Sequence, residues 1–160
     1  MNTPVAKDRF GYYSPAASTR FLQALTKSGL SRGQIRRWVS RQWKKKGYTI
    51  VDAIRGGIKY RLYITENTTD DKIFTSSQLY DREEIDALAQ ALKMSSPHDG
   101  LNDATFVDIG ANIGHYALNL ARIGYSRIIA VEPNPRTIAI LSYHIAINDM
   151  ESQITVEPVC

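Results

Sequence analysis

The 160-residue sequence predicts an α/β fold: the first half of a doubly wound parallel sheet, preceded by a β-hairpin and a basic helical extension. Two observations lead to this fold class. Strand and helix patterns alternate over residues 105–159, which is the order that a parallel sheet requires. A tight glycine turn also joins the first strand to the first helix, at the edge where ligands bind in such sheets.

The pattern begins with a short apolar strand, Thr105 to Ile109. Gly110 and Gly114 follow it, and both allow positive φ and a close approach of the backbone to a ligand. The helix after them has one apolar face, which consists of Tyr116, Ala117, Leu120 and Ile123. Because the N-terminus of that helix directs free N–H groups at the turn, the segment suits a nucleotide-like ligand.

A second strand, Arg127 to Val131, ends at Glu132. A carboxylate at this position can accept hydrogen bonds from both hydroxyl groups of a ribose. Asn134 is then expected to cap a helix that has Pro135 at its first position. A third strand is expected over residues 154–159.

Charge separates two kinds of ligand at the glycine turn. A dinucleotide fingerprint is G-x-G-x-x-G, whereas the spacing here is D-x-G-x-N-x-G, with Asn112 in place of the middle glycine. Asp108 at the strand end would repel a pyrophosphate and attract a sulfonium cofactor that carries an ammonium group. We therefore favour S-adenosylmethionine, and a dinucleotide-binding Rossmann protein remains the alternative.

Three sequence segments resemble those of the FkbM-type S-adenosylmethionine-dependent methyltransferases. They are FVDIGANIGHYAL, VEPNP and LSYHIAIND. YDREEIDALAQAL resembles the lead-in helix of that family, so the resemblance covers roughly residues 48–160. The family usually has Asn where this chain has His144; we expect this departure to be minor, because the position lies on a helix away from the turn. The resemblance implies the first half of a Rossmann-like class I methyltransferase sheet.

The resemblance also implies which residues bind the cofactor. Asp108 and Gly110 would approach its methionine end, Glu132 would hold the ribose hydroxyls, and Asn134 would lie near the adenosine. The expected cofactor-binding residues are Asp108, Gly110, Ala111, Asn112, Gly114, Glu132 and Asn134. A purely structural interpretation stays open for some of them, since glycines can simply end a strand and Asn134 is already explained as a helix cap.

The implied reaction is O-methylation of a hydroxyl group on a sugar, polyketide or related small molecule. No residue is assigned as the catalytic base. Because the family's fold continues beyond Cys160 with further strands and helices, we expect a truncated enzyme. The alternative is a non-catalytic fragment or binding module that acts through its basic N-terminal helix.

The positive charge of the chain is concentrated near the N-terminus. Residues 1–60 carry thirteen Lys or Arg against Asp8 and Asp52, a balance of +11, although the whole chain carries only +4. Residues 31–46 predict a basic amphipathic helix, whose apolar stripe is Ile35, Trp38, Val39 and Trp43. We favour docking of this stripe on the rest of the protein and leave peripheral membrane contact open. Without a recognition module, we do not expect a nucleic-acid partner.

The remaining elements follow from turn and cap signals. Residues 48–51 and 58–64 predict a hairpin that turns at Arg55, Gly56 and Gly57. Residues 66–71 predict a polar loop, and Asp81 is expected to cap the next helix. The resulting domains are a basic helical extension, 1–46, and a partial S-adenosylmethionine-binding methyltransferase domain, 47–160.

Composition limits the remaining classes. Cys160 is the only cysteine and no Cys/His cluster offers a zinc site, so no metal is expected. The first 17 residues lack the order of a secretory signal, and no apolar run is long enough for a membrane span. We expect a cytoplasmic protein and leave its oligomeric state open.

Overall fold

The computed structural model describes residues 8–15, 41, 45, 49–76, 79–95 and 104–159. The described residues divide into two compact units. We name the described part of residues 8–80 the hairpin unit and the described part of residues 81–159 the sheet unit. The predicted boundary near residue 46 lies outside the described residues and stays a prediction. The same holds for the basic helix, of which only Arg41 and Lys45 are described, both helical and exposed.

The hairpin unit contains the expected antiparallel pair, β1 (Val51–Arg55) and β2 (Ile58–Leu62). Gly56 and Gly57 form its two-residue turn, with φ of 56° and 86°. A primed turn needs positive φ at both central residues, which glycine adopts without strain. Because Arg55 pairs with Ile58, β1 covers Val51–Arg55, and the predicted strand over residues 48–51 was placed too early.

A helix, α3 (Thr68–Thr75), replaces most of the polar loop predicted over residues 66–71. Asn67 caps it, and its side chain accepts a hydrogen bond from the N–H of Thr69. The sequence did not predict this helix, because its first turn consists of polar threonines and aspartates and shows no apolar periodicity. Its apolar contribution, Ile73 and Phe74, comes only in the last turn and is fully buried.

An ion pair fastens the N-terminal segment to the hairpin. Asp52 and Arg61, on opposite strands, are 3% and 0% exposed and pair through Nε–Oδ1 at 2.8 Å and Nη2–Oδ2 at 3.0 Å. The Asp52 carboxylate also accepts from the N–H groups of Gly11 and Tyr13, at 2.7 and 3.2 Å. Arg61 in turn donates to the carbonyl groups of Asp8 and Arg9. We name this arrangement the Asp52–Arg61 clasp.

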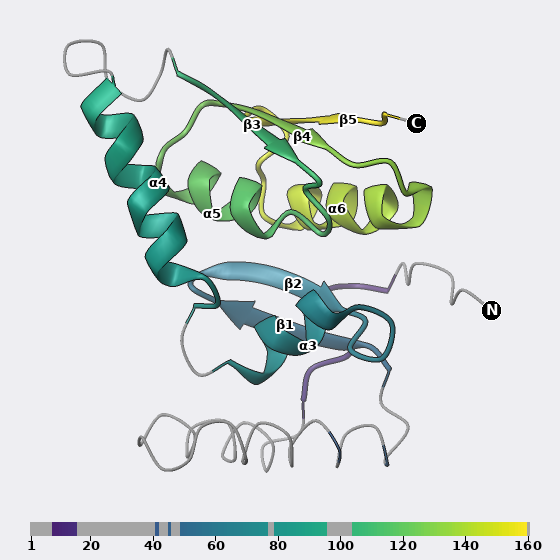
Figure 1. The fold of residues 1–160 in the computed structure, drawn as a ribbon. Helices are drawn as coiled ribbons and strands as arrows, with labels where there is room; N and C mark the ends of the chain where they lie inside the picture. The colour runs from purple at the N-terminus through teal and green to yellow at the C-terminus, as the bar shows by residue number, and fades with distance from the viewer. Residues whose placement is uncertain are drawn as a thin grey trace. The chain divides into compact units, whose positions relative to one another are not determined.

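The sheet unit has the predicted alternation of strands and helices. In chain order its elements are α4 (Arg82–Ser95), β3 (Thr105–Ile109), α5 (His115–Ile123), β4 (Arg127–Val131), α6 (Pro135–Ile147) and β5 (Ile154–Glu157). The strands are parallel in the order β3-β4-β5, and α5 and α6 both lie on one face of the sheet (Figure 1). The predicted strands over 105–109 and 127–131 are confirmed.

The two faces of this sheet differ in burial. Side chains on one face are buried, as shown by Ile128, Ala130 and Ile154 at 5% exposure or less. On the other face, Val107 and Ile109 are 49% and 83% exposed. Within the described residues, the sheet unit is therefore the first half of a doubly wound sheet, with helices on one face.

Asp81 does not form the predicted cap of α4. Its φ is +51°, and its carboxylate accepts a hydrogen bond from the Tyr116 hydroxyl at 2.9 Å. A residue with extended backbone would aim its side chain at the first free N–H groups of the helix, and Asp81 lacks that conformation. The carboxylate instead connects the start of α4 to α5.

Candidate functional site

The glycine turn, residues 110–114, is a compact loop with three residues in the left-handed region. Gly110, Asn112 and Gly114 have φ of 79°, 51° and 87°. The carbonyl oxygen of Val131, at the end of β4, accepts from the N–H groups of Gly110 and Ala111 at 2.9 and 3.0 Å. The turn is thus fixed against the carboxyl end of the neighbouring strand, the edge where the sequence predicted a site.

Glu132 joins the glycine turn to the start of α6. Its Oε2 accepts from the N–H of Asn112 and its Oε1 from the N–H of Asn134, both at 3.0 Å. The residue is 8% exposed. A carboxylate oxygen can accept more than one hydrogen bond, so both oxygens keep the capacity to accept from a ribose hydroxyl.

Asp108 lies at the end of β3 and is partly buried. Its Oδ2 accepts from the N–H of Ala117 in the first turn of α5, at 3.3 Å. Burial raises the pKa of the Asp108 carboxyl, and the bond to Ala117 acts in the opposite direction. A cationic group near Asp108 would therefore stabilise its ionised form.

The two glycines of the motif have different reasons to be glycine. A Cβ on Gly110 would meet no atom within 4 Å, so its φ alone favours glycine and open space lies above it. A Cβ on Gly114 would clash with Leu141 Cδ1 of α6. Gly110 thus leaves room for a ligand, whereas Gly114 allows a helix to pack closely.

Two further residues of the predicted set have structural roles. The Asn134 side chain accepts from the N–H groups of Arg136 and Thr137, which confirms it as the cap of α6. Ala111 is 5% exposed. These roles do not test whether either residue also contacts a cofactor, which stays a prediction for all seven residues.

His144 supports the glycine turn, contrary to our expectation that it lies away from it. The residue is fully buried, and its Nδ1 lies 2.9 Å from the carbonyl oxygen of Ile113. Because a carbonyl only accepts, Nδ1 carries the proton. The local sequence around His144 could not predict this contact, because the contact joins residues 31 positions apart.

The comparisons with known proteins agree with this geometry. Residues 58–159 match the model of the TRM5/TYW2 methyltransferase domain. The chain is 27% identical over 107 residues to a Pyrococcus horikoshii tRNA(Phe) (4-demethylwyosine(37)-C(7)) aminocarboxypropyltransferase. This match covers 67% of the chain and 33% of the relative, so the chain spans about a third of that protein's length.

The solved structure of a TYW2 protein shows the same fold. The crystal structure of P. horikoshii TYW2 in complex with MeSAdo has a TM-score of 0.52 at 20% identity, covering 83% of this chain and 49% of that one. The M. jannaschii tRNA m1G37 methyltransferase has a TM-score of 0.48 at 19% identity, covering 69% and 30%. The predicted fold class, a partial Rossmann-like class I methyltransferase domain, is confirmed.

The described part of the chain was also searched for helices that could cross a membrane. None of those helices is both long enough and apolar enough for a span.

These findings confirm the predicted enzyme class and correct its details. The FkbM-type assignment is not supported, because the matching family model is a different one. Our prediction of a small-molecule acceptor and no nucleic-acid partner was wrong, since the matched relative is named for the modification of tRNA(Phe). The glycine turn is a feature of the site for the methyl donor, so it predicts the donor better than it predicts the acceptor. With a match over residues 58–159, well over half of its length, the chain belongs to the TRM5/TYW2 methyltransferase domain family.

Proposed function

We propose that this chain carries the cofactor-binding part of an S-adenosylmethionine-dependent enzyme of the TRM5/TYW2 type that modifies tRNA. The observation that supports this most strongly is the position of two acids, Asp108 and Glu132, on either side of the glycine turn. Both lie at the carboxyl edge of a parallel sheet. Both side chains are anionic when ionised, so they favour a cationic donor over a pyrophosphate. The tRNA acceptor is proposed from the relatives.

The residues present fit S-adenosylmethionine. Glu132 has spare acceptor capacity for the ribose hydroxyls, and Asp108 offers a partner for the ammonium group of the methionine end. The open space above Gly110 admits a ligand close to the backbone. When bound, the cofactor supplies an activated methyl group on sulfur, and the turn and the two acids orient it. A tRNA acceptor agrees with the cytoplasmic location expected from the sequence.

The relative at 27% identity favours a second candidate reaction, transfer of the aminocarboxypropyl group from the same sulfonium centre. The two reactions break different carbon–sulfur bonds. Methyl transfer leaves S-adenosylhomocysteine, whereas aminocarboxypropyl transfer leaves methylthioadenosine. We favour methyl transfer because the matching family model is described as a methyltransferase domain.

Two measurements test the proposal. Calorimetric titration of the 160-residue chain with S-adenosylmethionine should show saturable binding, and titration with NAD should show none. The chain is then incubated with tRNA and a donor labelled either on the methyl or on the carboxyl carbon, and the by-product is identified by chromatography. Methyl label in the tRNA supports methyl transfer, and carboxyl label supports the second candidate.

The proposal fails if a folded sample binds no S-adenosylmethionine, which would favour the non-catalytic alternative. Cofactor binding without label transfer to tRNA would retain the cofactor site and reject catalysis by this chain alone.

A further inference from the structure

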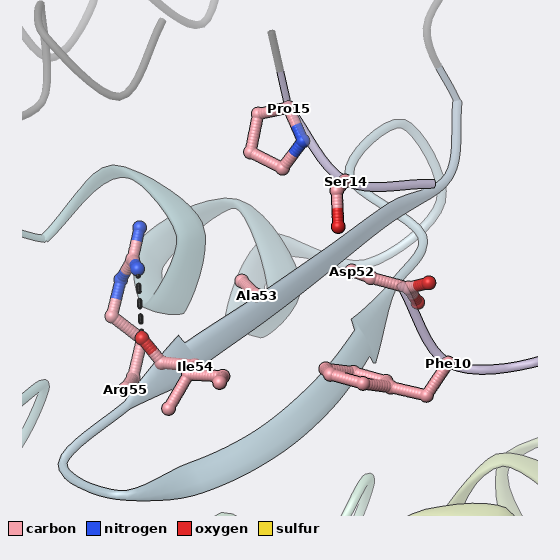
Figure 2. A pocket seen from close by; sticks show the side chains of 7 residues that line it. All are labelled: Phe10, Ser14, Pro15, Asp52, Ala53, Ile54 and Arg55. Carbon is pink, nitrogen blue, oxygen red and sulfur yellow. Dashed lines mark hydrogen bonds between the residues drawn. The ribbon is translucent and has the colours of Figure 1, made fainter. Parts of the chain in front are cut away.

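A cavity of about 250 Å³ lies in the hairpin unit, and none of the predicted cofactor residues lines it. Figure 2 shows it over β1, with the Phe10 ring and Ile54 on one side and Ser14 and Pro15 on the other. Arg55 lies at one end of the cavity and Asp52 at the other. The site combines an aromatic wall, an aliphatic floor and a cation.

The cavity is built from a fixed backbone. The Asp52–Arg61 clasp holds the chain on both sides of Phe10, since Arg61 donates to the carbonyl of Arg9 and Asp52 accepts from the N–H of Gly11. Asp52 also donates its own N–H to the carbonyl of Tyr13 at 3.0 Å. The wall that carries Phe10 is therefore preorganised, which lowers the entropic cost of binding a ligand there.

Arg55 provides hydrogen-bond donors at one end of the cavity. Its guanidinium donates to the carbonyl groups of Ile73, Phe74 and Ile54, at 3.2, 2.8 and 3.0 Å. A guanidinium has five N–H donors, so two remain for a ligand. Burial lowers the pKa of Arg55, and an anionic ligand would offset the cost of keeping this charge partly buried.

The exposed edge of β1 is too short to accept a peptide strand. The bond from Asp52 to Tyr13 shows that Asp52 and Ile54 are the residues whose backbone groups face this edge. The N–H of Asp52 and the carbonyl of Ile54 are already bonded, and the turn at Gly56 follows. Pro15, which has no N–H, lines the same cavity. This arrangement disfavours strand addition.

From these contacts we infer that the cavity accepts one unstacked nucleotide of an RNA, with its base against Phe10 and its phosphate or base edge toward Arg55. This inference rests on the tRNA acceptor proposed above. Proteins recognise single-stranded RNA by stacking bases on aromatic rings and by contacts with arginine. The balance of +11 over residues 1–60 complements the charge of a phosphate backbone.

The loop supplies a matched pair of variants for the test. Phe10 lines the cavity, whereas Tyr12, two residues later, is 73% exposed and does not line it. Phe10→Leu and Tyr12→Leu each remove one ring and keep an aliphatic side chain. Stacking of one base contributes roughly 1–3 kcal/mol, so Phe10→Leu should weaken RNA affinity about five- to hundredfold. Tyr12→Leu should change it less than about twofold.

The probe is a fluorescein-labelled tRNA transcript, titrated with the 160-residue chain at fixed salt and followed by fluorescence anisotropy. Circular dichroism shows whether each variant keeps its fold. If Phe10→Leu is unfolded, Ser14→Trp, which fills the cavity from the opposite wall, takes its place with the same expected loss. Equal effects of the Phe10 and Tyr12 variants would overturn the inference, as would wild-type affinity in a folded Phe10→Leu variant or no RNA binding by the wild type.

A separate readout distinguishes this inference from the proposed function. Calorimetry with S-adenosylmethionine should give the same affinity for Phe10→Leu as for the wild type. Phe10-dependent RNA binding by a chain that binds no cofactor would support the cavity and reject the proposed function. Cofactor binding with RNA affinity independent of Phe10 would support the proposed cofactor site and reject the inference about the cavity.

Discussion

Asp52 in the hairpin unit and Glu132 in the sheet unit are both buried carboxylates that hold backbone loops, and they differ in how many hydrogen bonds they accept. Asp52 accepts from two nitrogens of Arg61 and from two backbone N–H groups. Glu132 accepts from two backbone N–H groups, one on each oxygen. A carboxylate has about four acceptor positions, so the four bonds to Asp52 match this number, whereas Glu132 accepts only two. Saturation indicates a structural role, and spare capacity indicates a ligand site.

The largest effect is expected for Asp52→Ala, which tests the structural half of this comparison. The variant leaves the fully buried Arg61 without its carboxylate, and removing one partner of a buried ion pair costs about 3–5 kcal/mol. The free energy of unfolding from urea denaturation measures the loss. Asp86→Ala is the control, because it breaks an exposed pair with Arg82 that contributes at most about 1 kcal/mol. Equal losses would show that the clasp has no special role.

Glu132→Ala tests whether the spare acceptor capacity of Glu132 serves a ligand. It removes the expected ribose contacts and the bonds to Asn112 and Asn134, so affinity for S-adenosylmethionine should fall about 10- to 100-fold. Glu157→Ala is the matched control, an exposed glutamate at the end of β5. Calorimetry should show wild-type affinity for this control. Undiminished binding by a folded Glu132→Ala variant would remove Glu132 from the site.

The pH dependence of cofactor binding tests Asp108. Burial raises the pKa of its carboxyl in the free protein, and a bound cation would lower it again. Affinity should therefore rise as pH increases through the pKa of the free protein, by tenfold for each unit that binding lowers this pKa. Asp108→Asn should bind more weakly at neutral pH and lose this rise. A rise that persists in Asp108→Asn would assign it to another group.

The smallest effect is expected for His144→Leu. The variant removes the donor to the buried carbonyl of Ile113, which costs about 1 kcal/mol, so cofactor affinity should fall about threefold to tenfold. His144→Asn keeps a donor and should recover part of the loss. Ser142→Ala, at an exposed position of α6, serves as the control. If all three variants bind alike, α6 does not shape the turn through His144.

The sequence predicted the sheet unit better than the hairpin unit, and the reason is the range of the interactions. The strands at Thr105 and Arg127, the Asn134 cap and the two acids follow from local patterns. The Asp52–Arg61 clasp joins residues up to 53 positions apart, and no local pattern encodes it. Asp81 and His144 were misjudged for the same reason, because their partners lie 35 and 31 positions away.

The acceptor was mispredicted for a different reason. The glycine turn and Glu132 are specific for the donor and carry no information about what receives the transferred group. The basic balance of residues 1–60 was the only sequence feature that pointed toward RNA, and an amphipathic helix of the same charge suits a membrane equally well.

The close approach of Gly114 to Leu141 has a consequence for protein engineering. The loop that precedes α5 takes its shape partly from α6, which belongs to the next strand–helix repeat. Transplanting the DIGANIG segment alone into a foreign α/β scaffold should therefore yield a collapsed or mobile loop. A successful graft would need both repeats, so the smallest portable version of this motif extends from Thr105 to Ile147.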